Sequence, residues 1–183
     1  MRLYNYETAC VKKGDYPFPE IVDYKITVPC LNREDTLIYI FRSYCYGSYL
    51  YITDYFPQLY ENDSRRTSRF TSHEGYSINM RQLSVTCLAI FVEHFIKNDL
   101  RKAMVISGSY QDNENKCGPS RKLKLYQYFF YPLLTQLNLR SVEMMEYNAF
   151  ILTCRENPIS DNEIRQCYLA FRKIKNEHDD IAL

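Results

Sequence analysis

The chain has 183 residues, 46% hydrophobic and 25% charged, which is enough to build one compact α/β domain over residues 1–183. Its formal net charge of +1 argues against binding to nucleic acid or an anionic membrane through overall charge. No stretch reaches the roughly 20 apolar residues of a membrane helix. Residues 1–7 also lack the apolar region of a secretory signal, so we expect a cytoplasmic protein that does not enter a membrane.

Cysteine and histidine usage bears on metal and disulfide chemistry. The seven cysteines are scattered and include no Cys-x-x-Cys pair, and the three histidines lie far apart. This pattern is typical of neither a zinc site nor a disulfide framework, so we predict reduced thiols and no metal. The 18 tyrosines favour β-strands, in which an aromatic ring covers its neighbours while its hydroxyl stays in water.

The first half of the chain predicts mainly strands. Residues 26–31 and 36–47 are rich in β-branched and aromatic side chains, and the polar segment 32–35 between them predicts an antiparallel hairpin. The remaining elements expected in this half are a strand at 49–54, a loop at 61–66 and a short strand at 67–72.

Helices enter the pattern in the second half. Apolar residues recur at helical spacing through residues 81–98, which predicts an amphipathic helix lying across the sheet. Residues 102–107 are a short apolar run and predict a central strand with both faces buried. A loop at 111–120 then leads to a second amphipathic helix at 122–138, in which Pro132 predicts a kink or an early end.

The chain ends with a hairpin and a helix. Residues 141–146 and 149–154 predict a closing hairpin, because the two-residue link includes an Asn that tolerates a positive φ. Ser160 and Glu163 have the spacing of a capping box, so a terminal helix is expected at 160–176. The element order predicts an α/β (α+β) fold, with a splayed mixed β-sheet flanked by helices and this extra C-terminal helix appended.

The most specific pattern lies between residues 49 and 70. Residues 49–59 are Tyr-Leu-Tyr-Ile-Thr-Asp-Tyr-Phe-Pro-Gln-Leu, and Thr-Ser-Arg-Phe follows at 67–70 after a polar gap. An aromatic-proline corner followed by Ser-Arg-Phe, ahead of a long helix, resembles the acyl-homoserine lactone synthases. These are bacterial autoinducer synthases with an acetyltransferase-like (GNAT-like) fold. The resemblance covers roughly residues 23–152.

The resemblance implies an acyltransferase that makes a quorum-sensing signal. Such an enzyme moves an acyl group from acyl carrier protein to the amine of S-adenosylmethionine, a small-molecule substrate, and uses no cofactor. By resemblance, the substrate-binding residues would be Asp23, Arg42, Ser68, Arg69 and Phe70, with both arginines in one cleft beneath the first long helix.

The chain departs from the family pattern at the expected base. Where the family has a glutamate three residues before the signature arginine, this chain has Arg66, and a guanidinium cannot act as a base at neutral pH. Glu74 is the candidate catalytic replacement, although a lone Glu beside His73 is more often a solvated loop residue. Two alternatives therefore stay open: a catalytically inactive relative that serves as a binding or regulatory protein, and a divergent acyltransferase with another acceptor.

Two short basic runs predict a surface for an acidic partner. They comprise Arg65, Arg66, Arg121, Lys122 and Lys124, and they suit a carrier protein or its phosphopantetheine arm through charge-assisted contacts. Such runs are more often solvated faces of the protein. The near-neutral net charge and the lack of a recognised motif disfavour nucleic acid as the partner.

Overall fold

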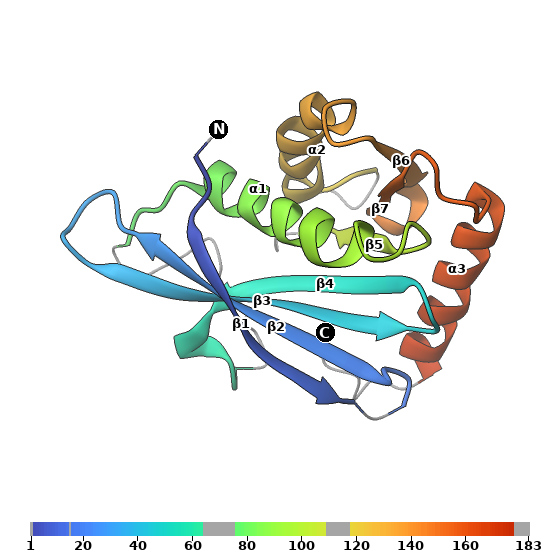
Figure 1. Ribbon diagram of the computed structural model, residues 1–183, viewed down its shortest axis with the longest axis horizontal. Helices are drawn as coiled ribbons and strands as arrows, with labels where there is room; N and C mark the ends of the chain where they lie inside the picture. Colours follow the sequence, from blue (N-terminus) through green and yellow to red (C-terminus); the bar gives the residue numbers. More distant parts are fainter. Residues whose placement is uncertain (1, 15, 64–75, 109–117, 178–183) are drawn as a thin grey trace.

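The computed structural model describes residues 2–14, 16–63, 76–108 and 118–177, and these form a mixed β-sheet flanked by helices (Figure 1). The strands are β1 (Asn5–Lys13), β2 (Glu20–Pro29), β3 (Thr36–Tyr46), β4 (Leu50–Pro57), β5 (Ala103–Ser107), β6 (Leu139–Met144) and β7 (Ala149–Cys154). Their order in the sheet is β1-β2-β3-β4-β5-β7-β6, and β4 and β5 are the one parallel pair among the described strands. The predicted α/β class with a mixed sheet is thus confirmed.

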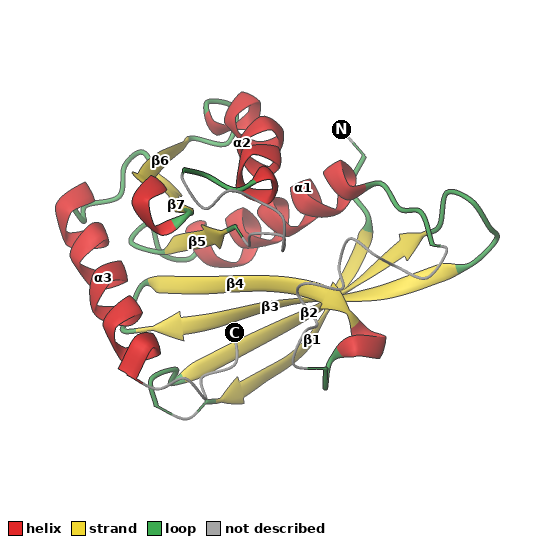
Figure 2. Cartoon of the chain, turned by 180° about the vertical axis from the view of Figure 1, so that it is seen from behind, coloured by secondary structure: helices red, strands yellow, loops and turns green. Residues whose placement is uncertain are grey.

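Helices cover both faces of this sheet (Figures 1 and 2). They are α1 (Met80–Phe91), α2 (Arg121–Leu134) and α3 (Asp161–Glu177), together with the single turns η1 (Gln58–Tyr60), η3 (Val92–Ile96) and η4 (Met145–Tyr147). Apolar side chains of α1 and α2, such as Leu88 and Phe130, pack on one face. Tyr168 and Phe171 of α3 pack on the other face. Within the described residues, no helix is long and apolar enough to cross a membrane.

The N-terminal part of the sheet is larger than the sequence patterns predict. The predicted hairpin at 26–31 and 36–47 is present, but β2 begins six residues earlier, at Glu20. Strand β1 is not predicted at all. It is an edge strand whose residues are mostly exposed, and its pairing with β2 shifts register between Thr8 and Cys10, so no alternation of apolar side chains marks it.

The two central helices lie close to their predicted positions. The predicted helix at 81–98 is α1 followed directly by η3, a π-helical turn. The predicted helix at 122–138 is α2, which ends at Leu134, two residues after Pro132 and four residues before the expected end. Strand β5 has four buried residues of five, as expected for a central strand.

The C-terminal elements agree most closely with the sequence patterns. Strand β7 has its predicted bounds, and Asn148 before it has a φ of 52°, in the left-handed region. At the start of α3, the backbone N–H of Ser160 donates to the Glu163 carboxylate at 3.0 Å, and the backbone N–H of Glu163 donates to Ser160 Oγ at 3.3 Å. The predicted capping box is therefore confirmed.

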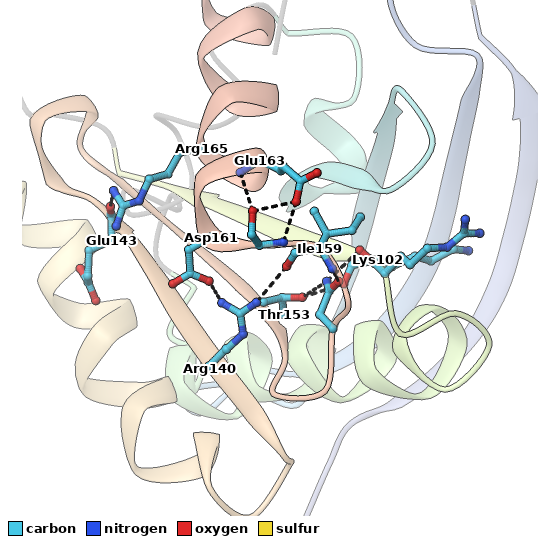
Figure 3. A network of polar contacts seen from close by, with 11 residues as sticks. Lys102, Arg140, Glu143, Thr153, Ile159, Asp161, Glu163 and Arg165 are labelled. Atoms are coloured by element: carbon cyan, nitrogen blue, oxygen red, sulfur yellow. Dashed lines mark hydrogen bonds and ion pairs between the residues drawn. The ribbon is translucent and has the colours of Figure 1, made fainter.

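Polar contacts fix the start of α3 against the end of the sheet (Figure 3). Arg140 of β6 forms an ion pair with Asp161 and donates to the carbonyl of Ile159 at 3.2 Å. The Asn157 side chain donates to the carbonyl of Arg101 at 3.0 Å and to Thr153 of β7. These contacts hold the first turn of α3 in place, and they thereby set the direction in which the rest of the helix crosses the sheet.

We expect a Ser160→Ala variant to lose about 1 kcal/mol of unfolding free energy, because one N–H of the first turn loses its acceptor. Urea unfolding followed by circular dichroism measures the loss. Asn162→Ala, an exposed substitution in the same helical turn, is the matched control and should change stability by less than about 0.5 kcal/mol. Equal effects of the two variants would contradict the capping role.

Candidate functional site

The sheet opens between its two parallel strands. Strands β4 and β5 pair over three residue pairs, from Leu50 with Ala103 to Ile52 with Val105, and then separate. Beyond that point β4 remains paired with β3, and β5 remains paired with β7. The Thr53 hydroxyl donates to the carbonyl of Val105 at 2.9 Å, so a side chain closes the ladder where the backbone pairing ends. This separation is the feature that creates room inside the sheet.

Two cavities meet at this opening. The inner cavity, of about 40 Å³, lies under α1 and α2 and is mainly apolar. Its lining residues are Phe41, Thr53, Asp54, Tyr55, Cys87, Leu88, Met104, Ile106, Ser107, Lys122, Tyr126 and Phe130. A second cavity, of about 260 Å³, lies on the other side of the sheet against α3 and is called the α3 cavity. Its lining residues are Tyr44, Ile52, Thr53, Asp54, Ser107, Gly108, Lys122, Tyr147, Tyr168, Phe171, Arg172 and Lys175. Four residues, Thr53, Asp54, Ser107 and Lys122, line both cavities.

Asp54 is a carboxylate at the junction of the cavities, and the sequence patterns assign it no role. A signal for it does exist. Acidic residues are depleted in strands, yet Asp54 stands within an aromatic and β-branched run that forms β4. An acidic residue in such a run indicates a polar function or a break in the pairing. The second condition holds here, because the pairing of β4 with β5 ends at Ile52, two residues before Asp54.

Lys122 is the cation at the junction. Its Nζ lies 5.9 Å from the centre of the Tyr126 ring, and burial lowers the pKa of its ammonium group, while the nearby Asp54 carboxylate opposes this shift. The predicted carrier-protein patch groups Lys122 with Arg121 and Lys124. Those two side chains are exposed on α2, so the structure separates Lys122 from them.

Two tyrosines add hydroxyl groups to the lining of the inner cavity. The hydroxyls of Tyr55 on β4 and Ser84 on α1 are 2.9 Å apart, and the Tyr55 and Tyr126 rings have centres 6.0 Å apart. Burial raises the pKa of both tyrosines, so both remain neutral hydrogen-bonding groups. They therefore supply hydroxyls, and not a base, at neutral pH.

Asp23 and Arg42, two of the predicted substrate-binding residues, lie directly opposite each other on β2 and β3. The guanidinium donates to both Asp23 carboxylate oxygens at 2.7 Å and to Glu61 at 2.6 Å. The Asp23 and Arg42 side chains are only 6% and 13% exposed. The hydrogen bond that Arg42 donates to Asp23 raises the pKa of the guanidinium further, so the arginine is a permanent cation.

The position of this ion pair differs from the expected cleft. Successive strand residues point to opposite faces, and the neighbours Tyr24 and Phe41 pack with the α1 core. Asp23 and Arg42 consequently lie on the face away from α1, and neither is among the described residues that line the two cavities. Asp54 is opposite Arg42 on β4 and so shares that face.

The other predicted site residues lie outside the part of the chain that the structure describes. They are Ser68, Arg69 and Phe70 of the signature, the candidate catalytic Glu74, and Arg65 and Arg66 of the basic patch. Their predicted roles stay predictions. The same holds for the expected strand at 67–72 and for most of the loop expected at 111–120.

Gly108 fixes the edge of the site at the end of β5. Its backbone N–H donates to the carbonyl of Asn148 at 2.8 Å, and the Asn148 side chain accepts from the backbone N–H of Ser120 at 2.8 Å. Ser120 caps α2 by accepting from Leu123. A Cβ on residue 108 would lie 2.2 Å from Ser120 Oγ and 2.8 Å from the Asn148 amide, so only glycine allows this approach.

A Gly108→Ala variant should therefore lose about 1–3 kcal/mol of unfolding free energy, as overpacking in a closely packed region does. Urea unfolding measures the loss, and Ser107→Ala on the neighbouring strand residue is the control. A midpoint equal to that of the wild-type protein would contradict the close approach of β5 to the start of α2.

Metal and disulfide chemistry find no support among the described side chains. No group of three His, Cys, Asp or Glu residues there comes together in a way that could hold a metal ion. The six described cysteines are free thiols.

Comparisons with known proteins identify no relative. No protein-family model matches the chain, and neither a curated protein nor a solved structure matches it.

Proposed function

We propose that this protein is an acyltransferase that joins an acyl group to an amine where β4 and β5 separate. The observation that carries the proposal is that two cavities of different character share Thr53, Asp54, Ser107 and Lys122. Two substrates that enter from opposite sides of the sheet would meet at these residues. The inner cavity is mainly apolar and suits an acyl group, whereas the α3 cavity is larger and more polar and suits the acceptor.

The residues at the junction suit the chemistry of this reaction. When an amine attacks a thioester, a nitrogen–carbon bond forms, the carbon–sulfur bond breaks, and the carrier thiol leaves with a proton. The amine must first lose a proton, and Asp54 is the carboxylate placed to accept it. The ammonium group of Lys122 is a donor for the oxyanion that develops on the carbonyl oxygen.

The substrates proposed are acyl carrier protein as donor and S-adenosylmethionine as acceptor, in a cytoplasmic protein of the acyl-homoserine lactone synthase type. This choice rests on the sequence resemblance between residues 23 and 152 and on the acetyltransferase-like plan that it implies. The splayed mixed sheet is compatible with that plan. A cavity of about 40 Å³ holds about three water-sized groups, which favours a short acyl chain.

The direct test combines binding with product detection. Calorimetry with S-adenosylmethionine and with acyl carrier protein should show binding of each, and mass spectrometry of a mixture with butanoyl-carrier protein should show an acylated amine. Binding of the acyl donor with product from another amine would favour the divergent acyltransferase. Absence of any acylated product with a panel of amines would overturn the proposal.

A second candidate function is binding without turnover. Two observations favour it: Arg42 is held by Asp23 and Glu61 and lines neither of the two described cavities, and Arg66 stands where the synthases have a glutamate. An inactive relative would keep the sheet and cavities but use them to bind a ligand in a regulatory role. Ligand binding in the absence of any product identifies this case.

A further inference from the structure

The appended helix α3 supplies one wall of the α3 cavity. Its apolar residues Tyr168 and Phe171 pack on the sheet, and their rings lie 6.2 Å apart. Arg172 and Lys175 follow on the same side of the helix and line the cavity. Because the contacts in Figure 3 fix the first turn of α3, the position of these two cations is built into the fold.

The side chain of Arg172 is oriented by aromatic residues. Its guanidinium carbon lies 5.4 Å from the centre of the Tyr147 ring, within the range of a cation–π contact. Arg172 also interacts with the hydroxyl of Tyr168, and this contact helps to oppose the rise in the Tyr168 pKa that burial causes. A planar guanidinium held in this way still has donors for a bidentate contact with an acid group.

The charges around the α3 cavity are unbalanced. Among its described lining residues are three cations, Lys122, Arg172 and Lys175, and one carboxylate, Asp54. Burial and then the neighbouring Arg172 lower the pKa of Lys175, and burial lowers the pKa of Lys122. Holding like charges together in a partly buried space costs free energy, and an anion between them would offset that cost.

We propose that the α3 cavity binds a small molecule through a carboxylate or phosphate group, held between Arg172 and Lys175. Lys122 approaches the same ligand from the start of α2, and the aromatic side chains of Tyr44, Tyr147 and Phe171 contact its apolar part. A cavity of about 260 Å³ has room for a ligand of this kind. The inference deepens the proposed function: if the reaction is the proposed acyl transfer, on which this part of the inference rests, the acceptor is a substrate with an acid group. The anion site itself does not depend on that reaction.

Calorimetry with two anionic probes, phenyl phosphate and benzoate, tests this site, with benzamide as the neutral counterpart. Either anion should bind and benzamide should bind at least about tenfold more weakly, since a charge-assisted contact is lost. The tighter of the two anions identifies the preferred acid group. Benzamide binding as tightly as both anions would overturn the proposal, and so would failure of both anions to bind.

Matched variants on α3 locate the site. Arg172→Gln and Lys175→Gln should each weaken anion binding by about tenfold. Lys173→Gln removes an exposed cation from the same helix and should change binding less than about twofold. An equal loss in Lys173→Gln would show a general charge effect and overturn the proposal. If Arg172→Gln fails to fold, Lys175→Gln with its Lys173→Gln control carries the test.

The results separate this inference from the proposed function. Anion binding that depends on Arg172 and Lys175, without acyl transfer to any amine, would support the anion site and contradict the acyltransferase proposal. Acyl transfer that proceeds unchanged in Arg172→Gln and Lys175→Gln, with neither anion binding to the wild-type protein, would contradict the anion site and support the acyltransferase proposal.

Discussion

An Asp54→Asn variant should lose acyl transfer by a factor of about 10² to 10⁴, because an amide cannot accept a proton from the attacking amine. Asn has nearly the same shape as Asp, so the walls of both cavities should be preserved. The loss should therefore appear in kcat, with the dissociation constants of both substrates changed much less. Single-turnover kinetics and calorimetry on the same preparation measure the two quantities separately.

Asp35→Asn is the control for this substitution, because it makes the same chemical change at an exposed site in the β2–β3 turn. It should leave transfer unchanged. Full activity in Asp54→Asn would show that another group accepts the proton, and Glu74, predicted from the sequence, would be the next residue to replace. Loss of binding together with turnover would instead assign Asp54 to holding the substrate.

An Asp23→Ala variant should lose about 3 kcal/mol of unfolding free energy, because it leaves the guanidinium of Arg42 in a largely buried position without its bidentate partner. The value lies at the lower end of the range for buried pairs because Glu61 still accepts from Arg42. Urea unfolding of the purified variant gives the measurement. Asp35→Ala, which removes an exposed ion pair with Arg33, should cost less than about 1 kcal/mol.

This variant also separates two roles for Asp23. If Asp23 is a structural partner of Arg42, its loss lowers the stability of the protein, while the affinity of the remaining folded protein for substrate stays the same. If Asp23 is instead a substrate-binding residue, as the resemblance predicts, its loss weakens substrate binding and leaves the stability of the protein nearly unchanged. An Asp23→Leu, Arg42→Met double variant with stability close to wild type would further support the structural role, since apolar residues can replace a buried ion pair.

Local chemistry explains which elements the sequence predicts well. The capping box at Ser160 depends on residues three apart, and the left-handed Asn148 depends on one residue, so both are visible without any knowledge of the fold. Strand β1 is different, because an exposed edge strand with a register shift has no apolar alternation to detect. The start of β2 does carry a signal, because Val22 and Tyr24 continue the alternation of Ile26 and Val28 with polar residues, and the predicted strand simply begins too late.

The candidate site depends on contacts between distant parts of the chain. Separation of β4 from β5 cannot be predicted from either strand alone, so the sequence marks Asp54 as an unusual strand residue but does not place it between two cavities. The predicted basic patch groups Lys122 with Arg121 and Lys124 because all three are basic. Helical spacing does distinguish them: Lys122 is one turn before the buried Tyr126, which is itself one turn before Phe130, and this spacing indicates an inward-facing lysine.

The short pairing of β4 with β5 has a consequence for ligand entry. Each half of the sheet, β1–β4 and β5-β7-β6, keeps its own antiparallel hydrogen bonds, and past Ile52 and Val105 the described residues of β4 and β5 form no further backbone pairs with each other. Widening the gap beyond those three residue pairs would break the Thr53–Val105 hydrogen bond but no backbone pair between β4 and β5, so we expect the three pairs to act as the pivot of any opening. Amide hydrogen exchange should accordingly stay slow at the pivot while ligand uptake remains fast.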